Sequence, residues 1–294
     1  MRVVDEVAVG TAGDGPYAVV ETPDGALWTT LPFSGRVARV RFDGSGARVD
    51  HLDAGGPAAR PSVLAVDAAG EGVWVTCTGD QRLRLVGPGG VLQDVGLPAG
   101  TDPYGIAGAG GDLLVAGLGG ALLRIRDGGV VAAVDLPPGS FPGAVAVAAD
   151  GAVWCTLNQA DALARWVPGS PVELHPTGPA AAPVGICPDD SGGIWWTEIG
   201  AGRIGHRTSQ GVVSAVDLPG TTPRPHAVAD DGAGGCWVTA WGQGALLHVY
   251  PERGVTSLDL GTGSEPHGLA VAADGSVRVA LESGTLVRVV AGTA

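Results

Sequence analysis

Short apolar runs alternate with turn residues along the whole chain of 294 residues. Within the runs, apolar and polar residues mostly alternate, and the runs are separated by glycine, proline and Asp-Gly pairs such as Asp150-Gly151. Alternation with period two is typical of half-buried strands, and Asp-Gly between such strands favours a tight hairpin turn. No stretch keeps the apolar period of an amphipathic helix. The pattern therefore predicts an all-β protein.

The pattern of strands is itself repeated. A proline followed by a short apolar strand recurs at spacings of 45, 42, 39, 41, 42 and 41 residues. A second position, tryptophan in most copies, follows each proline by 11 to 13 residues. The first copy predicts four strands, at residues 17–21, 26–30, 36–41 and 47–51. Four short antiparallel strands repeated seven times are typical of a β-propeller. The copies begin at Pro16, Pro61, Pro103, Pro142, Pro183, Pro225 and Pro266.

The two ends of the repeat array complement each other. The last copy predicts only three strands, at residues 269–272, 277–281 and 286–290, and a spare alternating strand at residues 3–9 precedes the first copy. The spare strand can complete the seventh blade, which closes the ring and removes exposed sheet edges. We expect a seven-bladed β-propeller closed by the N-terminal strand, with residues 1–294 forming a single domain.

Composition narrows the classes of function. The 51 glycines and 22 prolines fall between the strand-like runs and supply the turns. The formal net charge of −13, without any basic stripe, argues against nucleic acid as a partner. The four cysteines stand in different copies without a CxxC pair, so we expect free, mostly buried thiols in a reducing compartment. No apolar signal segment or membrane-spanning run is present, so we expect a cytoplasmic monomer without membrane contact.

Reactive side chains gather on one arc of the predicted ring. In a propeller, the start of each innermost strand and the end of the second strand lie on one face, around the central axis. Blades six and seven place Trp241, Glu265 and Glu282 there, whereas blades four and five offer Gly143 and Val184. This asymmetry predicts a functional site. The residues that directly follow the seven prolines are Tyr17, Ser62, Tyr104, Gly143, Val184, His226 and His267.

Some of these residues also have a structural explanation. One histidine after a proline can simply cap backbone groups, but two at equivalent positions on adjacent blades, flanked by two carboxylates, favour a function. Glu198 is predicted to be either a rim contact or part of a solvated loop. Four other histidines are expected on the third or fourth strands of their blades or in the adjoining turns, towards the outside of the ring, and carry no assigned role: His51, His175, His206 and His248.

Two histidines beside two glutamates suit more than one reaction. Glutamate oxygens are hard ligands that suit Mg²⁺ with several waters retained, and Zn²⁺ on two histidines and two glutamates is the competing choice. With a metal polarising a substrate carbonyl, a neutral histidine can abstract a proton in an elimination or activate water in a hydrolysis. Residue types alone leave both reactions open. The HExxH, GxSxG and P-loop motifs are absent.

Three kinds of segment carry a family resemblance. They are the Pro-Tyr/His-Gly/Ala strand starts, the segments at residues 25–29 and 196–205, and the Glu265-Pro266-His267-Gly268 segment with Glu282 after it. Together they resemble the virginiamycin B lyase (streptogramin B lyase) family over essentially the whole chain. The resemblance implies a seven-bladed propeller that opens the ring of type B streptogramins, which are cyclic depsipeptides, by Mg²⁺-dependent elimination at the ester.

The resemblance also implies roles for individual residues. His267 would be the general base, Glu265 and Glu282 would bind Mg²⁺, His226 would contact the substrate and assist the metal site, and Tyr17 would line the pocket. We therefore expect a carbon–oxygen lyase that inactivates an antibiotic. The alternatives are a metal-dependent lactonase or esterase at the same site, and a non-catalytic propeller that binds a peptide or protein. The rim adds two further substrate-binding candidates, Trp241 and Tyr104.

Overall fold

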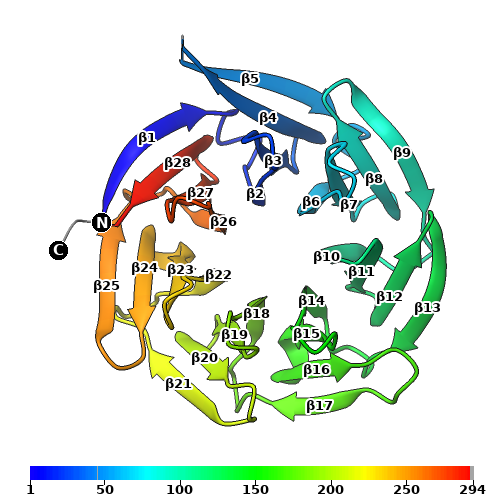
Figure 1. Cartoon of the computed structure of the whole chain (residues 1–294), viewed down its shortest axis with the longest axis vertical. Helices are drawn as coiled ribbons and strands as arrows, with labels where there is room; N and C mark the ends of the chain where they lie inside the picture. Colours follow the sequence, from blue (N-terminus) through cyan, green and yellow to red (C-terminus); the bar gives the residue numbers. More distant parts are fainter. Residues whose placement is uncertain (45, 292–294) are drawn as a thin grey trace.

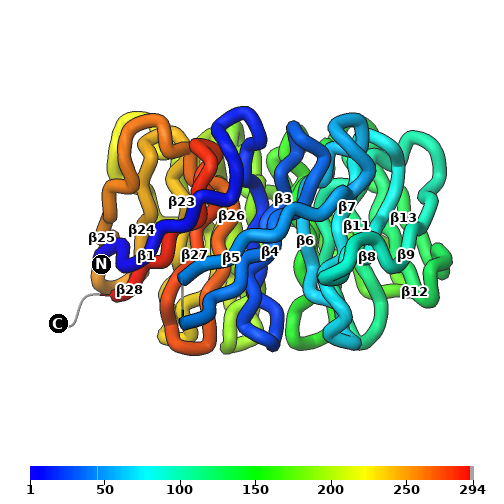
Figure 2. The backbone as a smooth tube through the Cα atoms, turned by 90° about the horizontal axis from the view of Figure 1, so that it is seen from above, coloured from blue at the N-terminus to red at the C-terminus, as the bar shows by residue number. Residues whose placement is uncertain are grey.

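The structure, a computed structural model, describes residues 1–44 and 46–291. Within these ranges, 28 strands form seven four-stranded antiparallel sheets, which stand as blades around a common axis (Figure 1). Figure 2 shows the turns between strands along two opposite rims of the ring. The predicted seven-bladed β-propeller is therefore confirmed. No helix in the described ranges is long and apolar enough to cross a membrane.

The strands follow the predicted order in every blade. Blade one contains β2 (Val19–Glu21), β3 (Leu27–Leu31), β4 (Arg36–Asp43) and β5 (Gly46–Asp53). Blade two contains β6 (Pro61–Val66), β7 (Val73–Cys77), β8 (Arg82–Gly87) and β9 (Gly90–Gly96). Blade three contains β10 (Pro103–Ala109), β11 (Asp112–Gly117), β12 (Ala121–Arg126) and β13 (Gly129–Asp135). Blade four contains β14 (Pro142–Val147), β15 (Val153–Leu157), β16 (Ala162–Trp166) and β17 (Glu173–Pro176), with the short 3-10 helix η1 (Asn158–Ala160).

The remaining blades repeat this arrangement. Blade five contains β18 (Pro183–Pro188), β19 (Ile194–Glu198), β20 (Arg203–Arg207) and β21 (Val213–Asp217). Blade six contains β22 (Pro225–Asp230), β23 (Cys236–Ala240), the 3-10 helix η2 (Trp241–Gln243), β24 (Ala245–Tyr250) and β25 (Gly254–Asp259). Blade seven contains β26 (Pro266–Val271), β27 (Val277–Leu281), β28 (Thr285–Val290) and β1 (Arg2–Ala8).

Blade seven closes the ring. β1 pairs antiparallel with β28 and forms the outer strand of this blade (Figure 1), as predicted. Two contacts then join blade seven to blade one: His51 Nε2 lies 2.7 Å from the Val9 carbonyl oxygen, and Arg278 lies 3.5 Å from Glu21. Because Arg278 stands where most copies carry tryptophan, an ion pair takes the place of the aromatic ring at this seam.

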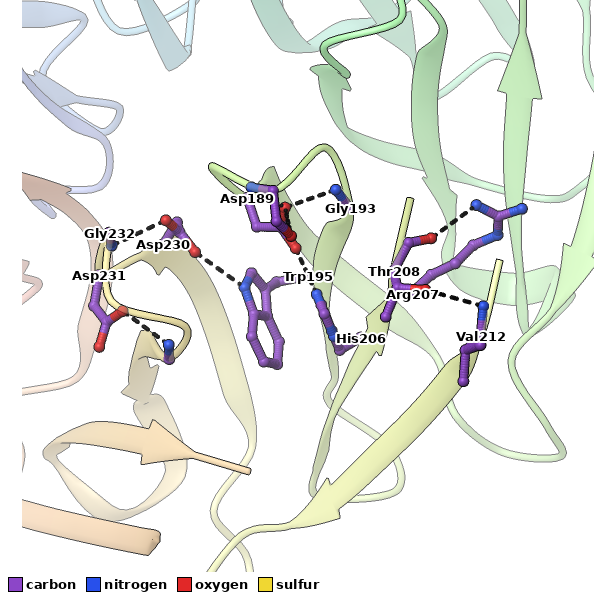
Figure 3. Close-up of polar contacts among 12 residues, drawn as sticks. Asp189, Gly193, Trp195, His206, Arg207, Thr208, Val212, Asp230, Asp231 and Gly232 are labelled. Atoms are coloured by element: carbon purple, nitrogen blue, oxygen red, sulfur yellow. Dashed lines mark hydrogen bonds and ion pairs between the residues drawn. The ribbon is translucent and has the colours of Figure 1, made fainter. Parts of the chain in front are cut away.

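Six blades share an aspartate bonded to an arginine or histidine next to the tryptophan position. In blade five, His206 stacks on Trp195 with ring centroids 3.9 Å apart and lies 2.6 Å from Asp189 (Figure 3). His248 stacks on Trp237 in blade six with centroids 3.7 Å apart. Both histidines lie on the third strand of their blade, β20 and β24, as predicted, and the ring stacking and the bond to aspartate hold their side chains against the blade. The six pairs are Arg39–Asp24, Arg124–Asp112, Arg165–Asp150, His206–Asp189, His248–Asp231 and Arg288–Asp274.

A threonine two residues after the tryptophan position joins one blade to the next. Thr197 Oγ1 accepts a hydrogen bond from an amide of its own blade and donates to the His226 carbonyl at 2.9 Å. Thr239 makes the same two bonds, and its donation to the His267 carbonyl is 2.7 Å long. A hydroxyl can do both at once. The threonines that bridge blades in this way are Thr30, Thr76, Thr156, Thr197 and Thr239.

The apolar core lies between neighbouring blades. Trp195 of blade five packs in one buried cluster with Val228 and Val238 of blade six. Each blade therefore depends on its neighbours to bury its apolar faces, which is the main favourable term in folding. The four cysteines are free thiols, as predicted; three are buried and Cys187 is half-buried.

Candidate active site

His267 is the centre of a cluster that contains the residues predicted from the sequence. Its ring centroid lies 4.6 Å from that of Tyr17, 4.8 Å from that of His226 and 6.1 Å from that of Trp241. Its Nε2 atom lies 2.8 Å from Glu282 Oε2. These five residues come from blades six, seven and one, so ring closure is what brings them together.

The backbone places the two histidines at equivalent points of adjacent blades. Both follow a repeat proline, and the threonine bridges from Thr197 and Thr239 hold their carbonyls. Gly268 then allows blade one to approach closely: a Cβ atom at this position would lie 2.5 Å from the Tyr17 carbonyl oxygen. The Gly268 amide instead donates to that oxygen at 2.7 Å. This contact sets Tyr17 beside His267.

Glu265 is directed by an uncommon backbone conformation. Its φ of +48° lies in the left-handed region, which is unfavourable for residues with a Cβ atom. The Glu282 amide donates to the Glu265 carbonyl at 3.2 Å and couples the two acidic segments.

The residues directly before the seven repeat prolines share this conformation. The sequence analysis did not recognise them as a set, although their common position before a proline was the available signal. The seven residues share φ values between 44° and 61°: Gly15, Arg60, Asp102, Phe141, Ala182, Arg224 and Glu265.

His267 has the properties of a neutral base. Burial lowers the pKa of His267 to about 4, so the imidazole is uncharged near neutral pH. Because the Glu282 carboxylate can only accept a hydrogen bond, Nε2 carries the proton and Nδ1 carries the lone pair. Nδ1 has no hydrogen-bond partner among the described residues. The ring therefore holds an unengaged basic nitrogen.

Tyr17, Tyr104 and His226 form a buried hydrogen-bonded chain. Tyr17 Oη lies 2.9 Å from His226 Nε2 and also bonds to Tyr104 Oη. Burial and His267 lower the pKa of His226 to about 3, and burial raises the pKa of both tyrosines. All three side chains are therefore uncharged near neutral pH.

Three buried polar atoms of this cluster lack a hydrogen-bond partner in the part of the chain that the structure describes. They are His226 Nδ1, Trp241 Nε1 and His267 Nδ1. Most buried polar atoms of folded proteins are paired, and each exception requires an explanation. A polar ligand or water beside the His267 imidazole would complete the hydrogen bonds of these atoms.

Glu265 and Glu282 are the candidate ligands for a divalent cation. Burial and the neighbouring Glu282 carboxylate raise the pKa of Glu265, and a cation would relieve this repulsion. Within the described ranges, no group of three or more His, Cys, Asp or Glu side chains is arranged to hold a metal alone. Mg²⁺ keeps several waters and binds through one or two carboxylates, so it fits this pair. The preformed set of three or four side chains that Zn²⁺ uses is missing from the described residues.

Two cavities open beside the cluster. One, of about 370 Å³, is lined by Phe33, Arg60, Leu118, His267 and Glu282 among others. The other, of about 490 Å³, is lined by residues that include Arg224, Trp241, Gln243 and Glu265. The two cavities offer space for a ligand next to His267 and Glu282 on one side and next to Glu265 on the other. Sequence reasoning did not select Phe33, Arg60, Leu118 or Arg224.

Glu198 ends the second strand of blade five, and the prediction that it belongs to a solvated loop is wrong. Its side chain is 1% exposed. Arg203 donates two hydrogen bonds to Oε2, at 2.8 and 2.5 Å, and Trp196 Nε1 donates to Oε1 at 3.0 Å. The adjacent strand β20 supplies the compensating charge, so the carboxylate is buried within blade five.

The fold is a seven-bladed propeller, and the candidate site lies where blades six, seven and one meet. The sequence matches the virginiamycin B lyase family over residues 2–289, and the chain belongs to this family. It is 38% identical over 218 residues to a virginiamycin B lyase of Nocardia farcinica, a match that covers 72% of this chain and 73% of that protein.

Solved structures are similar over nearly the whole chain. A streptogramin B lyase structure has a TM-score of 0.88 and 30% identity, and the match covers 97% of this chain and 96% of that one. Virginiamycin B lyase from Staphylococcus aureus has a TM-score of 0.89 and 25% identity, with 97% of both chains covered. A catalytically inactive variant of the S. aureus protein, with quinupristin, is similar to the same degree.

Proposed function

We propose that this protein is a carbon–oxygen lyase that inactivates type B streptogramins by opening their ring at the ester bond. The single observation that carries the proposal is the unengaged Nδ1 atom of neutral His267, beside two facing carboxylates. Family membership supports the substrate class. Further support comes from the S. aureus relative, whose catalytically inactive variant with quinupristin carries a histidine-to-alanine change.

His267 would remove the proton in the bond-breaking step. Its Nδ1 takes a proton from the carbon next to a substrate carbonyl, and the electron pair of that bond forms a carbon–carbon double bond. The bond from the adjacent carbon to the ester oxygen breaks, and the oxygen leaves as part of a carboxylate. The Glu282 carboxylate keeps Nε2 protonated and stabilises the imidazolium that forms. The product has the same atoms as the substrate.

Glu265 and Glu282 would hold the metal, and His226, Tyr17 and Trp241 would orient the substrate. When bound, Mg²⁺ supplies stabilisation of negative charge on a substrate oxygen. Trp241 Nε1 is an unpaired buried donor that suits a peptide carbonyl of a depsipeptide. The two cavities beside the cluster provide space for the rest of the ring.

Mass spectrometry tests this proposal directly. We expect the protein with Mg²⁺ to convert a type B streptogramin into a linear product of unchanged mass that contains a new alkene. EDTA should stop the reaction, and excess Mg²⁺ should restore it. A product heavier by one water would contradict elimination and show that the same site catalyses hydrolysis. Absence of turnover together with absence of Mg²⁺ binding would favour a non-catalytic propeller.

A further inference from the structure

Tyr104 reaches the candidate site from the other side of the ring. It follows the repeat proline of blade three, whereas Tyr17 belongs to blade one and His226 to blade six. The Tyr17 hydroxyl bonds to the Tyr104 hydroxyl, 87 positions away, and to His226 Nε2, 209 positions away. Tyr17 is thus the middle member of a chain that connects three blades across the axis.

The aromatic rings meet in edge-on arrangements. Tyr17 and His226 have ring centroids 5.4 Å apart and an interplanar angle of 83°. Tyr17 and Tyr104 have centroids 6.3 Å apart and an angle of 65°. In the described part of the chain, the Tyr104 hydroxyl bonds only to Tyr17. Among the described residues, the Tyr104 hydroxyl therefore reaches His226 through Tyr17, and the Tyr104 side chain also lines the cavity beside His267 and Glu282.

The protons of this chain have a preferred order. Each uncharged phenol has one proton to donate, and a neutral imidazole has one N–H and one acceptor nitrogen. A phenol O–H is a stronger donor than an imidazole N–H, and an imidazole nitrogen is a stronger acceptor than a phenol oxygen. Tyr104 then donates to Tyr17, and Tyr17 donates to His226 Nε2. The proton of His226 consequently resides on Nδ1.

The opposite order is less favourable. If His226 Nε2–H donated to Tyr17, Tyr17 would donate to Tyr104, and the buried Tyr104 proton would have no acceptor among the described residues. His226 Nδ1 would then also remain as an unpaired lone pair. A buried donor without a partner costs about 1–3 kcal/mol. The favoured order leaves one unpaired group, the Nδ1–H of His226, and donation from Tyr104 strengthens the next bond in the chain.

We propose that Tyr104 is a positioning residue that acts through Tyr17 to keep the His226 proton on Nδ1, where it serves as a hydrogen-bond donor next to His267. The tautomer follows from the contacts alone, whereas the use of the donor rests on the proposed function. The Nδ1–H of His226 lies in the same cluster as the basic Nδ1 of His267. His226 thus presents a hydrogen-bond donor to the substrate, and His267 presents the nitrogen that accepts the substrate proton.

Nitrogen NMR of ¹⁵N-histidine-labelled protein, without substrate, tests the tautomer. In the wild-type protein we expect His226 Nδ1 to resonate as a protonated nitrogen and Nε2 as an unprotonated, hydrogen-bonded one; the His226→Gln spectrum assigns these signals. Tyr17→Phe should shift the proton toward Nε2. Tyr104→Phe should move the Nε2 signal toward the value of a free acceptor. Tyr250→Phe is the matched control and should change neither signal.

Two results would overturn the proposal: a wild-type His226 protonated on Nε2, or a Tyr104→Phe variant whose His226 signals match the wild type. In turnover assays, Tyr104→Phe should lower kcat about tenfold with KM within about twofold of the wild type, as for other residues that orient a functional group. A purely structural role would lower thermal stability and leave the NMR signals and kcat unchanged. If the wild type has no lyase activity while the NMR result holds, the proposed function fails and the tautomer assignment stands.

Discussion

Three histidines of this protein lie within hydrogen-bond distance of a carboxylate, and they belong to two different regions. His206 and His248 pair with aspartates at 2.6 and 2.8 Å between the strands of blades five and six, whereas His267 pairs with Glu282 at 2.8 Å at the rim. The distances are nearly the same. The histidine–carboxylate bond therefore does not mark the functional site.

The surroundings of the pairs distinguish the two regions. His206 and His248 stack on tryptophans and bond to aspartates, and Asp231 beside His248 also accepts backbone amides. His267 has no stacked tryptophan at such a distance, and its second nitrogen is buried without a partner. The stacked tryptophans hold His206 and His248 within their blades, whereas His267 keeps an unpaired ring nitrogen beside the candidate site.

The largest expected effect of a mutation is at the rim. His267→Ala should lower kcat/KM about 10²–10⁴-fold because the proposed base is removed. The unfolding midpoint in urea should stay near that of the wild type, since the side chain is bonded only to Glu282. Turnover measured by mass spectrometry and unfolding followed by circular dichroism check the two parts. Full turnover by this variant would remove His267 from its proposed role.

The second effect should appear in the blade interior, where a mutation should lower stability and leave activity unchanged. His248→Leu should lower the free energy of unfolding by about 1–3 kcal/mol, because the buried carboxylate of Asp231 loses a hydrogen-bond donor. Turnover should match the wild type at temperatures where the variant is folded. Denaturant titration and the same turnover assay test this. A fall in activity at unchanged stability would show that the two regions are not separate.

The smallest effect concerns Asp274 of blade seven, which is exposed and pairs with Arg288 as Asp231 pairs with His248 in blade six. Hydrogen bonds from Ser276, and beyond them the Arg288 guanidinium, lower the pKa of Asp274 to about 2. A lowered pKa contributes stability above the unfolded value near 3.8, and this contribution is lost as the pH falls through about 2. Asp274→Asn should therefore be less stable than wild type at neutral pH, by less than about 1 kcal/mol because the side chain is largely exposed. The urea midpoints of the wild type and of Asp274→Asn should differ at pH 7 and converge at pH 2.

Local patterns were sufficient to predict the blades. The spacing of prolines and Asp-Gly turns predicted the strands to within a few residues: residues 286–290 were expected where β28 runs Thr285–Val290, and residues 3–9 where β1 runs Arg2–Ala8. Turn and strand preferences depend on a few neighbouring residues, so they can be recognised in a single sequence. Glu198 could not be placed in this way, because its burial depends on Arg203 and Trp196 packing around it.

The sequence by itself determined the repeat, the number of blades, the closure by the first strand and the arc on which His226, His267, Glu265 and Glu282 gather. Only the tertiary structure decided which polar groups are satisfied. The bonds from Tyr17 to Tyr104 and to His226 join positions 87 and 209 residues apart. Such contacts exist only in the closed ring, because they join inner strands of three different blades across the central axis.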